Sequence, residues 1–180
     1  MTAKNDVLNE ETKATGLPPQ EQILMNEQEL IAGLLAASNY TEDEDSQKLV
    51  QVKRNKKIFF EFMIRPLGEK ELMKIRKSSV DKYKNPHGKH LPQIEGDVRL
   101  YEFRSKKIYA ATTDEYKAKL WDNPQVKASL VAQGKDIIES WEIIDAVLMA
   151  GEKDQISDLI DEISGYNNDE NVTLEEYAKN

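Results

Sequence analysis

The chain has 180 residues, of which 39% are hydrophobic and 32% charged, and its formal net charge is -8. These values suit one globular domain with a modest core, and the excess of acidic residues disfavours non-specific binding to nucleic acid. The absence of cysteine from the sequence excludes disulfides, thiolate metal sites and cysteine nucleophiles, and every apolar run is too short to span a membrane.

The beginning of the chain is predicted to form a polar arm followed by a short helix. Residues 1–25 lack the apolar core of a signal peptide and are expected to be a flexible arm. Asn26 is a candidate N-cap for the helix, with Glu29 at the capping-box position. The helix has one apolar face, made by Leu30, Ile31, Leu34 and Leu35. An acidic stretch at 41–47 then predicts a solvated linker.

Alternating apolar and polar residues predict a β-hairpin between residues 48 and 64. Val50 and Val52 share one face of the first strand, and one face of the second is formed by Ile58, Phe60, Phe62 and Ile64. Residues 54–56 are expected to turn the chain, because asparagine at position 55 tolerates positive φ. Pro66 ends the second strand. A two-stranded hairpin is marginal alone, so we expect its aromatic face to pack on helices.

The middle of the chain is predicted to alternate between helices and loops. Residues 69–80 have helical periodicity and begin after Gly68. Residues 81–97 contain two prolines, two glycines and both histidines of the chain, which indicates a loop.

The next two segments are also predicted to be helical. Over 98–112, a cap at Asp97 and one side lined by apolar and small residues favour a helix, while alternation around Val98 leaves a strand as the alternative. The side in question carries Tyr101, Ser105, Ile108 and Thr112. Residues 114–130 are expected to form short helical pieces broken at Asn123-Pro124.

Two amphipathic helices between residues 136 and 166 are predicted to organise the rest of the chain. The first carries an apolar stripe of Ile137, Trp141, Ile144 and Leu148, widened by Ile138 and Val147, and Gly151 is its expected C-cap. The second carries Ile156, Leu159, Ile160 and Ile163. Gly165 closes this helix, and Tyr166 is placed to fold back onto it. Such stripes must be covered by the protein itself or by a partner.

Candidate catalytic and ligand-binding residues are sparse. His87 and His90 are spaced H-x-x-H but lack a third ligand, so exposed loop histidines are the simpler interpretation. The glycines are isolated, and no nucleophile-elbow motif occurs. We therefore predict no metal site, no cofactor and no enzymatic activity. Lys53–Lys57 followed by Phe59 suggests a strand face for nucleic acid, but five residues at a hairpin turn are more simply a solubilising turn.

The order of these features resembles a known family. The stretch KLVQVKRNKKIFFEFMIRPLGEKELMKIRK at 48–77 has a strand, a basic turn, a strand and then a helix after IRPL. The stretch IIDAVLMAGEKDQISDLIDEISGY at 143–166 has a helix ending in leucine, a small residue and Gly-Glu, and then a helix ending in Gly-aromatic. Both are similar to phage tail assembly chaperones of the PBSX-prophage type, found in long-tailed phages and prophages of Gram-positive bacteria. The resemblance covers roughly residues 27–167, and Ala150 stands where the family more often has proline.

The patterns and the resemblance together predict an α+β, mostly α fold. An N-terminal β-hairpin is expected to pack on a bundle of about four to six helices, between flexible termini. The expected organisation is an arm at 1–25, a single tail-assembly-chaperone-like domain at 26–167 and a polar C-terminal tail at 168–180.

The resemblance also implies a role. Such proteins bind the tape-measure protein, a long helical chain, and keep it soluble in the host bacterial cytoplasm while tail-tube subunits polymerise around it. Many are also made as a longer frameshifted form. We expect some homo-oligomerisation, and neither nucleic acid nor membrane as a partner. The alternative is a structural tail protein, an adaptor or terminator, that is retained in the virion. The hypothesised partner-binding residues are Trp141, Ile144, Leu148, Ile156, Leu159 and Ile160.

Overall fold

A computed structural model describes residues 19–40, 43–88 and 90–166 of the chain. The chain divides into two units, Met1–Asn39 and Tyr40–Asn180. Residues 1–18 of the predicted arm and the predicted tail at 168–180 lie outside the described residues. The predicted division into arm, domain and tail therefore stays a prediction.

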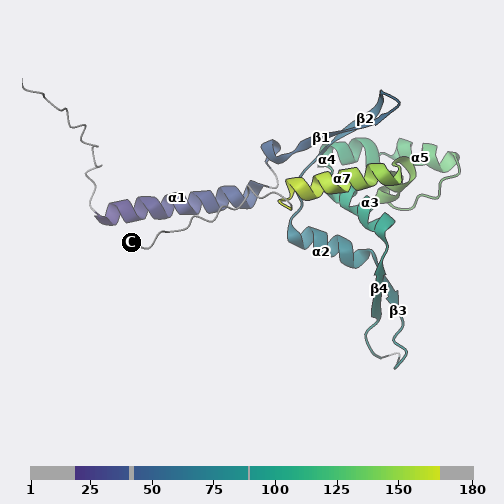
Figure 1. Ribbon diagram of the computed structural model, residues 1–180, viewed down its shortest axis with the longest axis horizontal. Helices are drawn as coiled ribbons and strands as arrows, with labels where there is room; N and C mark the ends of the chain where they lie inside the picture. The colour runs from purple at the N-terminus through teal and green to yellow at the C-terminus, as the bar shows by residue number, and fades with distance from the viewer. Residues whose placement is uncertain (1–18, 41–42, 89, 167–180) are drawn as a thin grey trace, which may run out of the picture. The chain divides into compact units, whose positions relative to one another are not determined.

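The first unit contains one described helix, α1, which runs from Pro19 to Asn39 (Figure 1). The helix begins before Asn26, so the predicted cap at Asn26 is wrong. Proline suits the first turn of a helix because its fixed φ is close to the helical value. The N–H groups of that turn have no acceptor within the helix, so the lack of an N–H in proline removes no hydrogen bond. Every side chain described on α1, from Glu27 onward, is exposed. Packing against the second unit therefore does not bury these described side chains.

The second unit begins with the 3₁₀ turn η2 (Glu44–Ser46) and the predicted β-hairpin. Strand β1 (Lys48–Arg54) pairs antiparallel with β2 (Lys57–Ile64), with a register shift after Val52. The turn residues Asn55 and Lys56 have φ of 51° and 66°. Two successive positive φ values define the turn type whose twist matches that of a two-residue hairpin. The predicted hairpin and its turn are confirmed.

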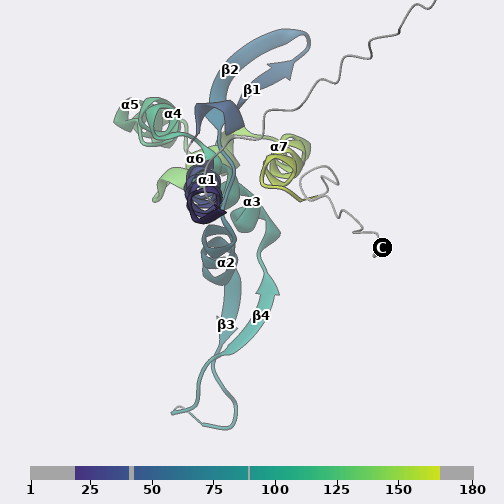
Figure 2. The ribbon, with the colours of Figure 1, turned by 90° about the vertical axis from the view of Figure 1, so that its left-hand side faces the viewer.

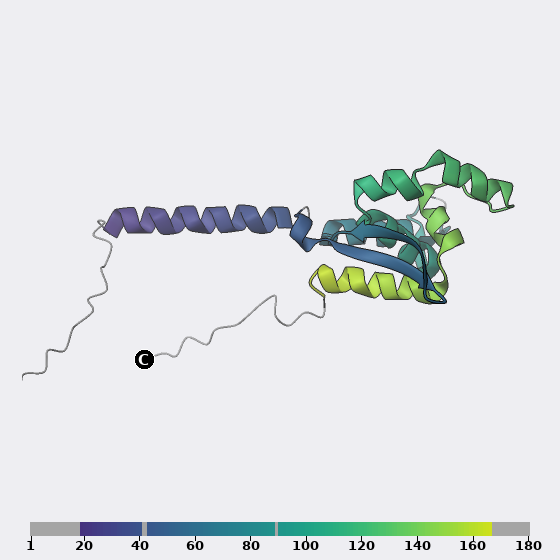
Figure 3. The same ribbon diagram turned by 90° about the horizontal axis from the view of Figure 1, so that it is seen from above.

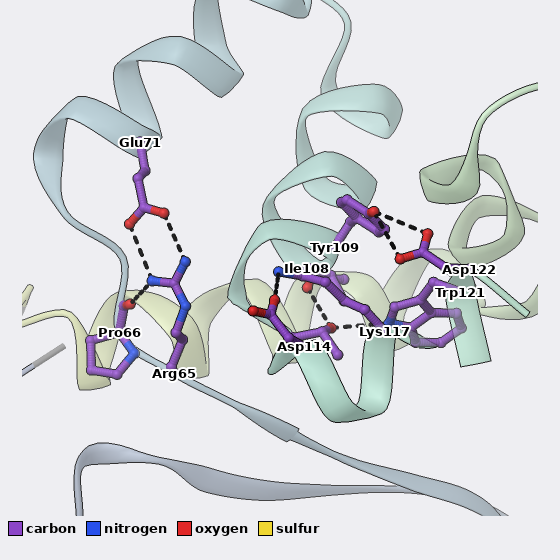
Figure 4. A network of polar contacts seen from close by, with 10 residues as sticks. Arg65, Pro66, Glu71, Ile108, Tyr109, Asp114, Lys117, Trp121 and Asp122 are labelled. Carbon is purple, nitrogen blue, oxygen red and sulfur yellow. Dashed lines mark hydrogen bonds and ion pairs between the residues drawn. The ribbon is translucent and has the colours of Figure 1, made fainter. Parts of the chain in front are cut away.

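The inward face of the hairpin packs on helices, as expected. Its buried side chains are Val50, Val52, Phe62 and Ile64. The ring centroid of Trp121 lies 5.9 Å from that of Phe60 and 5.5 Å from that of Phe62, both edge to face. The Trp121 indole donates a hydrogen bond of 3.0 Å to the Thr112 hydroxyl, which donates in turn to the Ile108 carbonyl (Figure 4). The aromatic centre of the core therefore has its one buried polar atom satisfied.

The helices of the second unit surround α3, which lies at their centre (Figures 1 and 2). They are α2 (Glu69–Ser78), α3 (Leu100–Ala111), α4 (Asp114–Tyr116), the π-helical turn η3 (Lys117–Trp121), α5 (Pro124–Ala132), α6 (Ser140–Val147) and α7 (Ala150–Ile163). Asn123 caps α5 through its side chain, which confirms the predicted break before Pro124. The predicted α+β, mostly α fold is confirmed.

The loop predicted for 81–97 is wrong at both ends. Strand β3 (Val80–Tyr83) pairs antiparallel with β4 (Ile94–Val98) and forms a second hairpin that projects from the helices (Figure 2). The Tyr83 ring lies so close to Gly96 that any side chain there would collide with it. This cross-strand contact stabilises strands too short to show alternation. Asp97 is consequently in a strand, and α3 begins at Leu100.

The glycines at the two ends of α7 behave differently. Gly151 lies in the first turn of α7 and is not the C-cap of α6, so that prediction is wrong. The Glu152 carboxylate accepts a 2.8 Å hydrogen bond from the Met149 N–H, which fixes the helix start before this glycine. Gly165 has φ of 91°, and the Tyr166 N–H donates to the Asp161 carbonyl at 2.9 Å. The predicted glycine cap at 165 is confirmed.

Candidate partner-binding surfaces

Most of the hypothesised partner-binding residues belong to the core. Ile144 and Ile160 are fully buried, and Leu148 and Ile156 nearly so. Trp141 is half-buried, and so is Leu159. A partner can therefore reach only these last two without opening the unit, and the hypothesis that the set serves partner binding stays a prediction.

Trp141 is also covered by neighbours on its polar side. The Lys106 ammonium lies 5.2 Å from the centroid of the indole ring, a cation–π distance. The indole N–H donates to the Glu139 carboxylate at 2.7 Å. The ring therefore has partners within the unit on its polar side.

Buried cations hold α7 against its neighbours. Lys107 of α3 is nearly fully buried, and its ammonium bonds the Ser157 carbonyl at 3.0 Å, the Ser157 hydroxyl at 2.9 Å and the Asp161 carboxylate at 2.7 Å. Lys153 of α7 is also buried and pairs with Asp145. Each buried ammonium thus has an anionic partner, as burial requires. The apolar stripes of α6 and α7 are closed onto the core by these contacts.

The basic turn is partly tied to the protein itself. Arg54 forms a 2.7 Å ion pair with Glu152 and donates to the Val147 carbonyl at 2.8 Å. The hydrogen bond from Arg54 lowers the pKa of Glu152, against the opposing effect of burial. Arg54 and Lys57 both lie over the exposed Phe59 ring, at 5.5 and 5.6 Å from its centroid. These contacts occupy Arg54, Lys57 and Phe59, three of the groups that the nucleic-acid interpretation would need.

The two histidines lie in the connection between β3 and β4. Both His87 and His90 are exposed. Across the described ranges, no group of three or more histidine, aspartate or glutamate side chains is arranged to hold a metal ion.

Helix α1 displays an apolar stripe to solvent. We call Leu30, Ile31, Leu34 and Leu35 the α1 stripe; they are 67%, 56%, 71% and 61% exposed. The sequence pattern identifies these residues as one apolar face, but our sequence-based hypothesis did not choose them as a partner site. Gly33 adjoins the stripe with open space around it, which permits close approach of another backbone. A contiguous exposed apolar surface of this kind is typical of a binding site.

A second surface with apolar residues runs between β1 and α7. It is a groove of about 350 Å³, which we call the β1–α7 groove. Residues 49–53 line one side, and the other side is lined by Glu152, Gln155, Ile156 and Leu159. Two of the six hypothesised partner-binding residues therefore meet at this groove.

The comparisons place the chain among tail assembly chaperones. The family model described as Phage XkdN-like tail assembly chaperone protein matches residues 25–179, which is most of the chain. The chain belongs to this family. Searches of curated proteins and of solved structures returned no match. No helix among the described residues is long and apolar enough to cross a membrane.

Proposed function

We propose that the protein binds the tape-measure protein of its phage and keeps it soluble during tail-tube polymerisation. Membership of the tail assembly chaperone family supports this role. The single observation that carries it is the exposed α1 stripe, because a protein that holds an apolar client needs apolar surface outside its own core.

The α1 stripe has the geometry to pair with a helical client. Residues spaced i, i+1, i+4 and i+5 lie along one side of α1, and an amphipathic client helix packs its own apolar face against such a ridge. Burying each of the four side chains contributes about 1 to 2 kcal/mol, since each is already partly covered by its own helix. Four such contacts supply a reversible affinity, which suits a holder that must release its client.

The net charge of -8 supports the same role. A strongly charged holder keeps an apolar client dispersed through repulsion between complexes. We place this activity in the host bacterial cytoplasm, with the tail-tube protein and a frameshifted longer form of the chain as further partners. The role is non-catalytic.

In this proposal, most of the partner-binding residues hypothesised from the sequence stabilise the core and do not contact the client. Ile144, Leu148, Ile156 and Ile160 maintain the core against which other surfaces are displayed. Leu159 extends the accessible apolar surface on the second unit. Charged residues at the four buried positions would unfold the unit, so they do not test binding.

The test is co-expression with the tape-measure protein encoded by the same phage. We expect the client to be soluble and to co-purify with the wild-type chain, and to become insoluble with the double variant Leu34→Glu/Leu35→Glu. The matched control is Ala36→Glu, which adds a charge to the opposite, also exposed, side of α1. Circular dichroism of each variant checks that helix content is kept.

Two results would contradict the proposal. Equal client solubility with the double variant and the control would remove the α1 stripe from client binding. Absence of co-purification with the wild-type chain, together with its presence in finished particles, would favour the structural tail protein.

A further inference from the structure

The charge of the chain is unevenly distributed. Residues 48–90 contain 13 basic and 4 acidic residues, a net charge of +9, although the whole chain carries -8. Helix α2 lies within this stretch and has four exposed basic residues: Lys70, Lys74, Arg76 and Lys77. None of the four forms an ion pair with a residue that the structure describes. Such a cluster of cations in an acidic protein favours an acidic partner.

An exposed methionine lies among these cations. At helical spacing, Met73 falls between Arg76 and Lys77 around the axis of α2, and its side chain is 51% exposed. Methionine is flexible and polarizable, and it is common on surfaces that bind other proteins. We call Lys70, Met73, Arg76 and Lys77 the α2 face. This face combines apolar contact with positive charge.

The α2 face continues into a hollow of about 290 Å³. Helices α2 and α7 both pack on α3, and all three contribute to the hollow. Its apolar lining comes from Leu72, Met73, Phe103 and Tyr166. The Lys107 ammonium and the Asp161 carboxylate also line it, but they are 2.7 Å apart and neutralise each other. The hollow can therefore accept an apolar side chain next to the cations of α2.

This surface is separate from the other two candidate surfaces. Figure 3 shows the first hairpin in front of the helices, whereas α2 lies on the other side of α3 in Figure 1. No residue that lines the β1–α7 groove also lines the hollow. The α1 stripe belongs to the other unit of the chain. A partner of the α2 face is thus distinct from a client held by the α1 stripe.

We propose that the α2 face docks an acidic amphipathic helix of a partner protein. An apolar side chain of that helix enters the hollow, and acidic residues one turn away from it contact Arg76 and Lys77. The surface is small, since α2 has only 10 residues, so the binding is weak and reversible. The proposal goes beyond tape-measure binding by the α1 stripe and does not depend on it.

Two other occupants suit this surface less well. The carboxylates of Glu69 and Asp161 line the hollow together with its apolar side chains, which disfavours the phosphates of a nucleic acid. A second copy of the chain brings a net charge of -8 against another -8, and this repulsion opposes its approach at neutral pH.

The test measures fluorescence anisotropy of a labelled synthetic peptide mixed with the full-length chain. The peptide has roughly 15 residues, enough to span α2 as a helix, with leucines along one face and glutamates on the others. We expect the wild-type chain to bind it, and to bind a peptide with glutamine in place of each glutamate at least roughly tenfold more weakly.

Variants of the chain then locate the binding surface. We expect roughly tenfold weaker binding for Arg76→Gln/Lys77→Gln, which removes two charges, and for Met73→Ser, which removes apolar surface without changing charge. The matched control Lys53→Gln/Lys135→Gln removes two exposed charges elsewhere and should stay within roughly twofold of the wild-type chain. Leu34→Gln/Leu35→Gln, in the α1 stripe, should bind the peptide like the wild-type chain. Circular dichroism checks that each variant is folded.

Other results would overturn the proposal. Equal loss in the α2 double variant and its matched control would reduce the effect to overall charge, and wild-type affinity in Met73→Ser would mean that the hollow accepts no side chain. Loss of binding only in Leu34→Gln/Leu35→Gln would place the peptide on the α1 stripe.

Two further measurements test the other occupants. A labelled DNA duplex that binds more tightly than the peptide, and loses affinity in Arg76→Gln/Lys77→Gln, would assign the α2 face to nucleic acid. Self-association of the wild-type chain at neutral pH that the same double variant abolishes would assign the face to a second copy.

Discussion

Glu71 links the end of the first hairpin to the start of α2. Its carboxylate accepts hydrogen bonds from the Arg65 guanidinium at 2.8 and 3.2 Å (Figure 4). It also accepts one from the Gly68 N–H at 3.1 Å. These bonds favour the charged form, so the pKa of Glu71 is lowered from its ordinary 4.5, with the Arg65 hydrogen bond as the largest cause and burial opposing it. One side chain thus fixes both the chain direction after β2 and the first turn of α2.

The Glu71 contacts predict a pH-dependent contribution to stability. Because the pKa is lower in the folded state, this contribution is present above the unfolded pKa and is lost as pH falls through the folded value. We expect Glu71→Gln to reduce the free energy of unfolding by about 0.5–1 kcal/mol at neutral pH, a figure already reduced for solvent screening, and by much less near pH 3. Urea unfolding at both pH values measures the difference.

A matched control for this prediction is Glu69→Gln in the same helical turn. Glu69 is exposed and forms no ion pair with a described residue. A loss of stability in Glu71→Gln that equals the control, or that does not change with pH, would contradict the assigned role of the Arg65 contact.

The sequence predicts single residues well where burial follows an apolar pattern. Phe62 and Ile64 are buried as the alternation indicates. Lys107 and Lys153 are not predictable in this way, because a lysine in an amphipathic helix is normally assigned to the surface. Their burial depends on anionic and carbonyl partners contributed by other helices or by distant turns, and a local pattern does not contain that information.

At the scale of elements, the turn of the first hairpin shows residual strain. Asn55 tolerates positive φ, but Lys56 also has φ of 66°, where a side chain is unfavourable. We expect Lys56→Gly to raise the free energy of unfolding by about 0.5 kcal/mol, after allowing for the greater freedom of glycine in the unfolded chain. Thermal or urea unfolding of the full-length chain measures this gain.

The control for the turn is Lys57→Gly, because Lys57 lies in β2 and not in the turn. Glycine there should lower stability through its weak strand propensity. If glycine lowered stability equally at positions 56 and 57, the turn would not be a source of strain.

Sequence patterns predicted the helices and strands that have clear periodicity or turn residues. They missed short strands that depend on a single contact between residues distant in sequence. The first hairpin and α2, α5 and α7 are marked by clear periodicity or turn residues. Strands β3 and β4 depend on the packing of Tyr83 on Gly96, two residues that are not adjacent in sequence. Gly151 suited a C-cap by its position after an apolar turn, but the carboxylate of Glu152 decides where the next helix begins.

At the scale of the whole molecule, the sequence alone does not show which apolar stripes belong to the core and which are exposed on the surface. The stripes on α1, α6 and α7 have the same periodicity, and a helix needs such a stripe whether its own fold or a partner covers it. The hypothesised partner set lies mostly in the core, whereas the α1 stripe is exposed. Which stripe is covered depends on packing between distant segments, including the buried contacts of Lys107.

Charge and apolar surface together predict how the molecule behaves in solution. The sequence pI is about 5.0, so the repulsion that accompanies a net charge of -8 disappears as pH falls from 7 toward 5. We expect self-association near pH 5, measured by static light scattering, because the α1 stripe then pairs between copies. Leu34→Glu/Leu35→Glu should remain dispersed at that pH, and Ala36→Glu should associate like the wild-type chain. Equal association of all three proteins would exclude the stripe as its cause.

The buried ammonium groups of Lys107 and Lys153 have a practical consequence. Amine-reactive reagents acylate exposed lysines rapidly, but these two side chains are only 2% and 6% exposed and already bonded to carboxylates. They should therefore be among the slowest lysines of the chain to be labelled. Their appearance in a mass-spectrometric footprint would report the moment at which α7 separates from the rest of the unit, without any engineered probe.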